Sequence, residues 1–344
     1  MRVLLIKTSS MGDVIHTLPA LTDAQQVIPG ITFDWVVEEG FVEIPRWHPA
    51  VDSVIPIAWR RWRKQLFAQT TRRQWVEFYH RVREKNYDLI MDAQGLVKSA
   101  LFSLVTKGRR AGLDWYSARE SIASLFYQKK CTVNFSQHAV VRMRQLFSAL
   151  LGYRMPDVMP DYGIDRNQFR VQDNKERYIV FLHGTTWATK LWPENYWIAL
   201  AKLAAAQGLQ VKITGGNDDE VARAKRLAAA CANVHVLPKL SIVEVAHMLA
   251  GAIAAVSVDT GFGHLAAALA VPTVSLYGPT NPEFTGAMGK NQVHLAAAFP
   301  CAPCLQRQCT YRGESPVFPA CFSTIMPEQV WERLKLYLYP TPCG

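Results

Sequence analysis

Three short segments of this chain combine glycine with side chains that can move a proton or hold an anion. The first is KTSSMGD at residues 7–13, which ends in Asp13. Gly12 permits a tight turn, and an acidic residue at the start of the helix that follows can cap it. A carboxylate in such a loop can equally act as a general base. Position alone leaves both roles open for Asp13.

The second segment, HGTTWATKLWP at residues 183–193, follows a strand-like run. Thr185 and Thr186 offer hydroxyl and backbone donors, and Lys190 offers a point charge suited to a diphosphate. A pair of capping threonines beside a solvated lysine is the alternative interpretation. Neither G-x-x-x-x-G-K-[ST] nor G-x-G-x-x-G occurs in the first loop, so a glycine fingerprint for nucleotides is not supported there.

The third segment is SVDTGFGHLAAAL at residues 257–269. Asp259, Thr260 and Gly261 lie where a strand gives way to a helix, and His264 follows one turn further in. The N-terminus of a helix favours anions, so this arrangement also suits a diphosphate. Taken one at a time, Asp259 could be a helix-capping residue and His264 a packed core residue, without any ligand. The place of this segment at a strand end, like that of the threonine-lysine loop, favours the binding role.

Basic residues concentrate in the first half of the chain. The net charge is +10, and residues 1–170 hold 24 Lys and Arg against 16 Asp and Glu. This excess indicates an anionic partner. It peaks in residues 60–85, which begin within WRRWRK at 59–64, the stretch that contains Arg60, Arg61, Arg63 and Lys64. Lipid phosphates, nucleic acid and plain solvation of a helix face are all compatible with this stretch.

The seven cysteines are an odd number, which favours reduced thiols over a disulfide framework. Four of them form C-x2-C-x4-C-x11-C, namely Cys301, Cys304, Cys309 and Cys321. Four thiolates can hold zinc or iron, but this spacing matches no standard finger. We therefore expect no bound metal and keep these four residues as weak candidates.

Strand-like and helix-like runs alternate along the chain, which predicts a parallel α/β architecture. The predicted strands are 2–7, 33–39, 52–58, 87–93, 178–184, 209–216, 234–237, 254–259 and 271–279. The predicted helices are 14–28, 193–207, 218–230, 241–251, 262–270 and 327–338. The pattern restarts after a polar stretch at 154–177, so we expect two doubly wound halves. Ligands of such sheets bind at the carboxyl ends of strands, where all three segments lie.

Together these segments resemble the ADP-heptose:lipopolysaccharide heptosyltransferases, and within that family the heptosyltransferase I branch. The resemblance covers KTSSMGDVIHTLPALTDA, FDWVVEEGF, IPIAWRRWRK, DAQGLVKSA, HGTT followed by K-x-WPE, and VSVDTGFGHLAAAL, in that order. It implies two Rossmann-like domains that face a cleft, the glycosyltransferase B type. The expected domains are 1–165 for the acceptor, 176–325 for the ADP-sugar, and 326–344 as a helix that packs back on the first domain.

The resemblance also implies roles for individual residues. Asp13 is expected to be the catalytic base of an inverting transfer of L-glycero-D-manno-heptose from ADP-heptose to the Kdo of Kdo2-lipid A. Contacts to the donor are expected from Thr185, Thr186, Lys190, Glu220, Leu240, Asp259, Thr260, Gly261 and His264. Contacts to the acceptor are expected from Ser9, Ser10, Gly12, Arg60, Arg61, Arg63 and Lys64. No cofactor is implied.

The location and two rival functions complete these expectations. The N-terminal apolar run is too short for a signal peptide, so we expect a cytoplasmic chain, peripheral on the inner membrane. The cysteine segment looks more like that of heptosyltransferase II. A heptosyltransferase II and a protein heptosyltransferase of the same family are therefore the first alternative. A non-enzymatic nucleic-acid-binding protein is the second alternative. No nucleic-acid motif supports it, and we expect no nucleic-acid partner.

Overall fold

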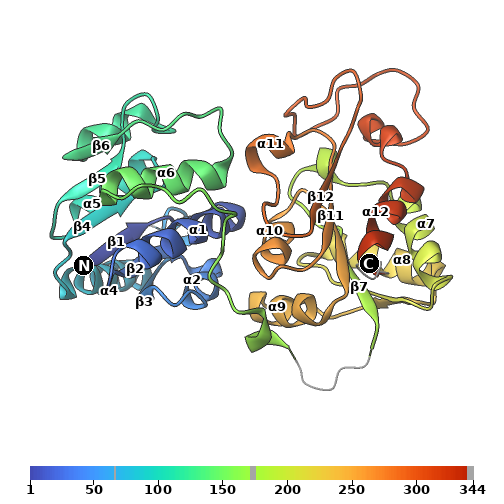
Figure 1. The fold of residues 1–344 in the computed structure, drawn as a ribbon, viewed down its shortest axis with the longest axis horizontal. Helices are drawn as coiled ribbons and strands as arrows, with labels where there is room; N and C mark the ends of the chain where they lie inside the picture. Colours follow the sequence, from blue (N-terminus) through green and yellow to red (C-terminus); the bar gives the residue numbers. More distant parts are fainter. Residues whose placement is uncertain (66, 171–175, 339–344) are drawn as a thin grey trace. The chain divides into compact units, whose positions relative to one another are not determined.

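The computed structural model describes residues 1–65, 67–170 and 176–338. Contacts divide the chain into two compact units, Met1–Ile164 and Asp165–Gly344, which are blue to green and green to red in Figure 1. Each unit has one parallel six-stranded sheet with flanking helices, so the expected α/β class is confirmed. Part of the polar stretch 154–177, namely 171–175, and the end of the expected segment 326–344, namely 339–344, lie outside the described residues.

The sheet of the first unit has the order β3-β2-β1-β4-β5-β6, and every neighbouring pair is parallel. This is the strand order of the Rossmann fold. Its strands are β1 (Arg2–Ile6), β2 (Thr32–Glu38), β3 (Val51–Ile57), β4 (Leu89–Asp92), β5 (Arg110–Leu113) and β6 (Lys129–Cys131). Residues 3–6 are fully buried, as expected of a central parallel strand that helices cover on both faces.

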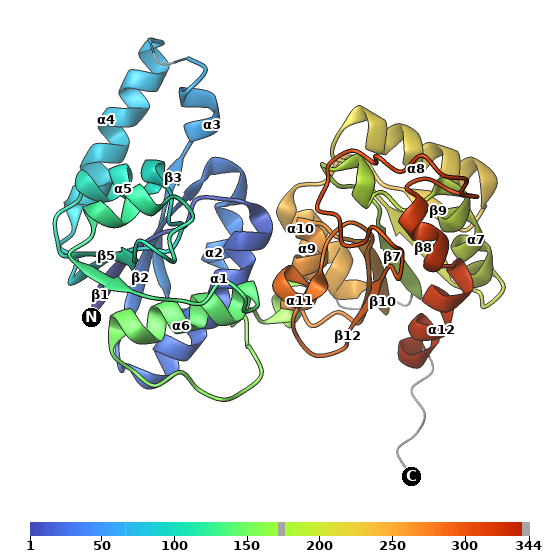
Figure 2. The ribbon, with the colours of Figure 1, turned by 90° about the horizontal axis from the view of Figure 1, so that it is seen from above.

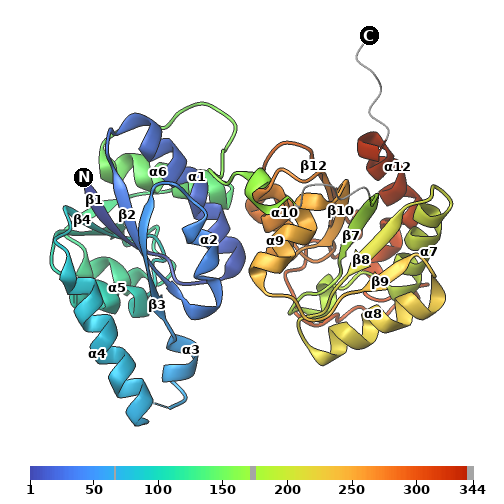
Figure 3. The same ribbon diagram turned by 90° about the horizontal axis from the view of Figure 1, so that it is seen from below.

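The helices of the first unit are α1 (Met11–Val27), α2 (Glu43–Arg46), α3 (Trp59–Trp62), α4 (Gln69–Glu84), α5 (Val97–Leu104) and α6 (Ala139–Leu151), with 3-10 turns η1 (Glu39–Phe41) and η2 (Ser121–Phe126). Figures 2 and 3 show α3 and the N-terminal end of α4 projecting from the body of this unit. No helix in the described ranges of the whole chain is both long and apolar enough to cross a membrane.

The second unit repeats the design. Its sheet has the order β12-β11-β10-β7-β8-β9, the same Rossmann order when its strands are counted from β7, and all its neighbours are parallel. Its strands are β7 (Tyr178–Leu182), β8 (Gln210–Ile213), β9 (Val234–Val236), β10 (Ala254–Val258), β11 (Thr273–Tyr277) and β12 (Gln292–Ala296). Its helices are α7 (Glu194–Ala205), α8 (Asp218–Ala230), α9 (Ile242–Gly251), α10 (Gly261–Ala268), α11 (Pro282–Thr285) and α12 (Pro327–Leu338), with η3 (Arg166–Phe169), η4 (Ala188–Lys190) and η5 (Ala320–Thr324).

Each sheet reverses its strand order at one place, between β1 and β4 in the first unit and between β7 and β10 in the second. At such a switch point the connections leave in opposite directions and open a crevice at the carboxyl ends of the strands. The Asp13 loop follows β1, and the two diphosphate-type segments follow β7 and β10. The topology therefore places all three segments at switch points.

The structure has three strands that the sequence pattern did not indicate: β5, β6 and β12. Strand β6 is only KKC, and both β6 and β12 lie at sheet edges, where half-exposed residues break the apolar run. Strand β5 is the four-residue run RAGL, too short to give a periodic signal. Helix α9 begins with a capping box, in which Glu244 accepts from the Ser241 amide at 2.7 Å and the Ser241 hydroxyl accepts from the Glu244 amide at 3.3 Å.

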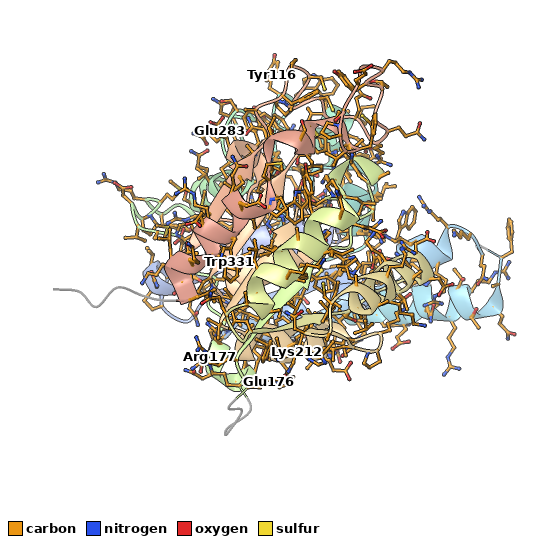
Figure 4. The ribbon with its side chains drawn as sticks, turned by 90° about the vertical axis from the view of Figure 1, so that its right-hand side faces the viewer. Tyr116, Glu176, Arg177, Lys212, Glu283 and Trp331 are labelled. Atoms are coloured by element: carbon orange, nitrogen blue, oxygen red, sulfur yellow. The ribbon has the colours of Figure 1, made fainter. Side chains whose placement is uncertain are left out.

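The C-terminal helix α12 packs into the core of the second unit. Its buried face, which includes Val330, Trp331 and Leu334, belongs to the core of the second unit, and the helix contacts α7, β10 and β11. Figure 4 labels Trp331 on this helix. Trp192 of the same unit donates through Nε1 to the carbonyl of Ile325, 3.0 Å away, just before the helix. The apolar stripe of α12 is thus buried within its own unit.

Candidate functional site

Asp13 is the third residue of α1 and forms a reciprocal cap with Ser10. Its Oδ2 accepts hydrogen bonds from the backbone N–H and the hydroxyl of Ser10, both at 2.8 Å. The capping role weighed from the sequence is therefore present. Asp13 also lines the pocket of the first unit, so the cap does not remove its carboxylate from the site.

Lys7 provides the charge that faces Asp13. It is buried, and its Nζ donates to the carbonyl of Ala93 at 2.9 Å. Burial acts to raise the pKa of Asp13, but the Lys7 ammonium and the two Ser10 hydrogen bonds outweigh it, so the pKa lies below its ordinary value. Burial lowers the pKa of Lys7 itself, against the attraction of Asp13 and Asp92. Asp13 is thus held ionised and ready to accept a proton.

The lowered pKa of Asp13 has a consequence for the pH dependence of any reaction that uses it as a base. The carboxylate loses its charge only as the pH falls below 3.8, its ordinary value. We expect kcat/KM to show no acid limb from this group between about pH 5 and 8. An acid limb near pH 6 that disappears in His16→Gln, a neighbour in the same pocket, would assign the base to His16 instead.

The pocket around Asp13 is strongly basic, which the sequence motifs did not reveal. It is lined by Lys7, Asp13, His16, Ala93, Gln94, Leu113, Ser117, Arg119, Val133, Phe135, Ala139, Arg142 and Met143. Arg142 comes from α6, and its buried Nε finds no hydrogen-bond partner among the described residues. Its guanidinium stacks 5.1 Å from the ring centre of Phe135. Such a cation is arranged to receive an anionic ligand.

The expected acceptor residues fall into two groups. Ser9, Ser10 and Gly12 lie in the loop beside Asp13, and the Ser9 amide donates to Oε1 of Gln94 at 3.3 Å. Gln94 follows β4, so the loop is tied across the switch point. The WRRWRK stretch forms α3 and the residues just after it, away from that loop in the sequence.

Within the WRRWRK stretch, Arg60, Arg63 and Lys64 are exposed. Arg61 differs, because its guanidinium pairs with Glu39 at 2.8 Å and donates to Gln74 at 3.0 Å. Its charge is already compensated within the unit. The other three side chains are the better candidates for a phosphorylated ligand.

The second unit brings Lys190 and Asp259 together from the ends of β7 and β10. The Lys190 ammonium lies 2.7 Å from Oδ2 of Asp259, and both side chains are largely buried. The same oxygen accepts from Thr280 at 2.7 Å, while Thr185 donates to the Asp259 carbonyl at 3.2 Å. Asp259 therefore fixes the position of Lys190. In this arrangement Asp259 positions Lys190, and its own contact with a donor stays a prediction.

An aromatic platform supports this pair. Lys190 lies 4.5 Å and Arg307 5.2 Å from the ring centre of Trp187. The hydroxyl of Thr189 donates to the carbonyl of Gln306 at 2.6 Å, so the 183–190 loop and the cysteine-bearing segment brace each other. Two cations on one ring concentrate positive charge at the loop. Trp187 and Arg307 carried no recognisable signal in the sequence.

Helix α10 starts beside the ion pair. Thr260 is its N-cap and Gly261 its first residue, so the first amides of the helix remain to bind an anion. A Cβ on Gly263 would lie 2.6 Å from the hydroxyl of Ser257, so glycine lets the helix pack close to β10. His264 is buried one turn further in.

The weaker donor candidates lie on neighbouring loops of the same sheet. Glu220, on α8, accepts from the Gly216 amide at 2.7 Å, and a Cβ on Gly184 would lie 2.6 Å from its carboxyl carbon. The structure thus joins Glu220 to the 183–190 loop. Leu240 is half-buried just before α9. His183 is neutral at pH 7, because burial and then Arg223 lower its pKa to about 4.

Comparison with known proteins decides the family. The model of glycosyltransferase family 9 (heptosyltransferase) matches residues 75–314. A lipopolysaccharide heptosyltransferase 1 of Pseudomonas aeruginosa is 55% identical over 98% of both chains. The chain belongs to glycosyltransferase family 9, the heptosyltransferases. It is therefore a glycosyltransferase, as the resemblance implied.

Solved heptosyltransferases share the fold. The Escherichia coli heptosyltransferase WaaC with ADP aligns at a TM-score of 0.87 and 47% identity, covering 97% of this chain and 99% of that one. WaaC with ADP-2-deoxy-2-fluoro heptose aligns at a TM-score of 0.83 and 46% identity, and it covers the same fractions of the two chains. A heptosyltransferase 2 of E. coli is 25% identical over 83% of this chain and 85% of its own length. The expected heptosyltransferase fold is thus confirmed, and the similarity favours the type 1 branch.

The four C-terminal cysteines of this heptosyltransferase differ in their exposure. Cys301 and Cys309 are exposed, Cys304 is intermediate, and Cys321 is buried. Burial, and then the other three thiols, raise the pKa of Cys321 to about 12, so this thiol is protonated at neutral pH. In the described part of the chain, no three His, Cys, Asp or Glu side chains are grouped to hold a metal.

The aromatic platform gives a testable effect on this heptosyltransferase. Trp187→Ala should raise KM for the nucleotide sugar about 2- to 30-fold, because a cation over an indole contributes roughly 0.5–2 kcal/mol. Trp187→Phe keeps a ring and should retain most of the affinity. Steady-state kinetics of both variants check this. Equal KM values for the alanine and phenylalanine variants would show that the ring itself does not matter.

Proposed function

We propose that this enzyme is a lipopolysaccharide heptosyltransferase 1, which moves L-glycero-D-manno-heptose from ADP-heptose to the Kdo sugar of Kdo2-lipid A. The observation that carries the proposal is the contrast between the two switch points. One holds an ionised carboxylate in a basic pocket. The other holds a lysine, threonine hydroxyls and a helix N-terminus. The high identity to heptosyltransferase 1 proteins supports this assignment.

The second unit would bind the donor. Lys190, oriented by Asp259, and the first amides of α10 would neutralise the diphosphate of ADP-heptose. Thr185 and Thr186 would donate hydrogen bonds to its oxygens. Glu220 and Leu240, on adjoining loops, would contact the adenosine. The ADP-sugar analogue in the E. coli relative supports this choice of donor for the family.

The first unit would bind the acceptor. Kdo carries a carboxylate, which suits the three cations Lys7, Arg119 and Arg142 in the pocket around Asp13. Arg60, Arg63 and Lys64 would meet the phosphates of the lipid A part. This acceptor is a membrane lipid, so we place the enzyme on the cytoplasmic face of the inner membrane as a peripheral protein.

The chemistry would be a direct displacement with inversion. The Kdo hydroxyl attacks the anomeric carbon of the heptose while the bond to the ADP oxygen breaks, through an oxocarbenium-like transition state. Asp13 takes the proton of the attacking hydroxyl. Lys190 and the α10 amides stabilise the charge that develops on the leaving ADP. The base and the groups that stabilise the leaving ADP thus come from different units, so both units are needed for the reaction.

The test supplies purified enzyme with ADP-heptose and either Kdo2-lipid A or an acceptor that already carries its first heptose. Transfer to Kdo2-lipid A supports the type 1 assignment. Exclusive transfer to the heptosylated acceptor would assign type 2 instead, and transfer to a protein would assign a protein heptosyltransferase. Complementation of a strain that lacks heptosyltransferase 1, with mass analysis of the lipopolysaccharide core, gives the same decision in cells.

A further inference from the structure

An exposed apolar face lies on the first unit outside the site described above. Leu101 and Leu104 on α5 are 47% and 42% exposed, and Ile122 and Leu125 on η2 are 55% and 66% exposed. Each pair is spaced three residues apart, so its members share one side of their element. Four large aliphatic side chains on adjoining elements are unusual for a surface that contacts only water. We call this set the apolar face.

The apolar face is held rigidly. Helix α5 and η2 pack against each other through a small core of Ala100, Ala123 and Tyr127. The Val97 amide at the start of α5 donates to the carboxylate of Glu120 at 2.7 Å, directly before η2. The outward leucines and isoleucine therefore point away from a fixed base and cannot be buried by a small rearrangement.

The loop that precedes η2 connects the apolar face to the acceptor pocket. Trp115 is 48% and Tyr116 84% exposed in this loop. The next residues, Ser117 and Arg119, line the pocket around Asp13. The loop is anchored by the Ser117 amide, which donates to Asp114 at 2.9 Å. Exposed aromatic side chains thus stand within three residues of a pocket that we assign to a lipid-borne sugar.

Basic residues flank the apolar face at both ends of α5. At the start of α5, burial and, after it, the charges of Arg60 and Arg63 lower the pKa of Lys98, so both exposed arginines lie near this end. At the other end, Arg83 of α4 donates to the carbonyl of Val105 at 3.1 Å, and Lys107 follows. Figures 2 and 3 both show α4 beside α5.

We propose that the apolar face, with Trp115 and Tyr116, inserts into the surface of a bilayer that contains anionic lipids. This rests on the proposed function, which requires a lipid-anchored acceptor at the adjacent pocket. The aliphatic side chains enter the acyl boundary, the aromatic pair sits at the headgroup level, and the flanking cations meet lipid phosphates. The acceptor sugar then reaches Asp13 without leaving its membrane.

Vesicle co-sedimentation tests the proposal, with vesicles of phosphatidylethanolamine and phosphatidylglycerol. The variant Leu104→Glu/Leu125→Glu should bind at least about tenfold more weakly than the wild type, and its deficit should persist at high salt, where surface charge is screened. The matched control is Val27→Glu/Leu336→Glu. Val27 ends α1 as Leu104 ends α5, and these controls are 45% and 60% exposed. The control should bind like the wild type.

A second readout separates this proposal from the proposed function. Transfer of heptose to a water-soluble, de-acylated acceptor should be unchanged in the variant, because the apolar face touches no reacting group. Absence of this transfer in the wild type would refute the proposed function and leave the vesicle result valid. The variant Leu104→Ser/Leu125→Ser adds no charge and should also bind vesicles weakly. It replaces the glutamate variant in the test if the glutamate variant does not fold.

Three outcomes would overturn the proposal. The first is equal vesicle binding by the wild type and both leucine variants. The second is no binding of these vesicles by the wild type. The third is a wild-type dimer that the leucine variants convert to a monomer, which would make the apolar face a contact between copies of the chain. Light scattering of the purified proteins distinguishes the last case.

Discussion

Replacing Asp13 with asparagine should lower kcat about 10²- to 10⁴-fold, the usual contribution of a general base, while ADP-heptose binds as before. Asparagine has nearly the same shape and still accepts a hydrogen bond from the Ser10 amide, so the start of α1 is preserved. It cannot accept the proton of the attacking hydroxyl. Initial rates at saturating substrates and donor titration by calorimetry check the two halves of this expectation.

Two further variants separate the base from the helix cap. Asp13→Ala removes both roles, so it should be as inactive as Asp13→Asn but less stable by roughly 0.5–2 kcal/mol. Ser10→Ala weakens the cap and keeps the carboxylate, so it should lose stability and retain most of kcat. Full turnover by Asp13→Asn, together with a loss of activity in Ser10→Ala, would mean that the cap matters and the base does not.

Replacing Lys190 with methionine should lower kcat/KM about 10²- to 10³-fold, the cost of removing one group that stabilises a leaving oxyanion. The affinity for ADP should fall by about tenfold, because one charge-assisted contact to the diphosphate is lost. Methionine keeps most of the aliphatic stem over Trp187. Donor kinetics and calorimetry with ADP measure the two effects, and unchanged ADP affinity would exclude a contact with the diphosphate.

The ion pair with Asp259 calls for a double-mutant cycle. Lys190→Met alone leaves the Asp259 carboxylate buried without its cation, which by itself is destabilising and would repel a diphosphate. Asp259→Asn removes that negative charge. If Lys190 binds the donor, the double variant stays impaired in kcat/KM although its melting temperature recovers. If the double variant recovered both its kcat/KM and its melting temperature, the role of Lys190 would be only to neutralise Asp259.

The sequence alone determined the local parts of this enzyme. Parallel strands such as β1 are buried on both faces, so their sequences are unbroken runs of apolar residues. Helix starts such as Ser241 carry their own capping residues. The loops after β1, β7 and β10 could therefore be placed at strand ends, and their residue types indicated a base and a diphosphate site. The family resemblance supplied the sugar chemistry, and the comparisons confirmed the family.

Only the tertiary structure decided which of these residues meet. Lys190 and Asp259 are 69 positions apart in sequence and become an ion pair because β7 and β10 are neighbours at the switch point. Arg142 joins Asp13 in one pocket because α6 packs on α1. Arg307 stacks on Trp187 across an even longer separation. No local pattern encodes such pairings, because they depend on strand order and helix packing, which arise from the burial of the whole chain.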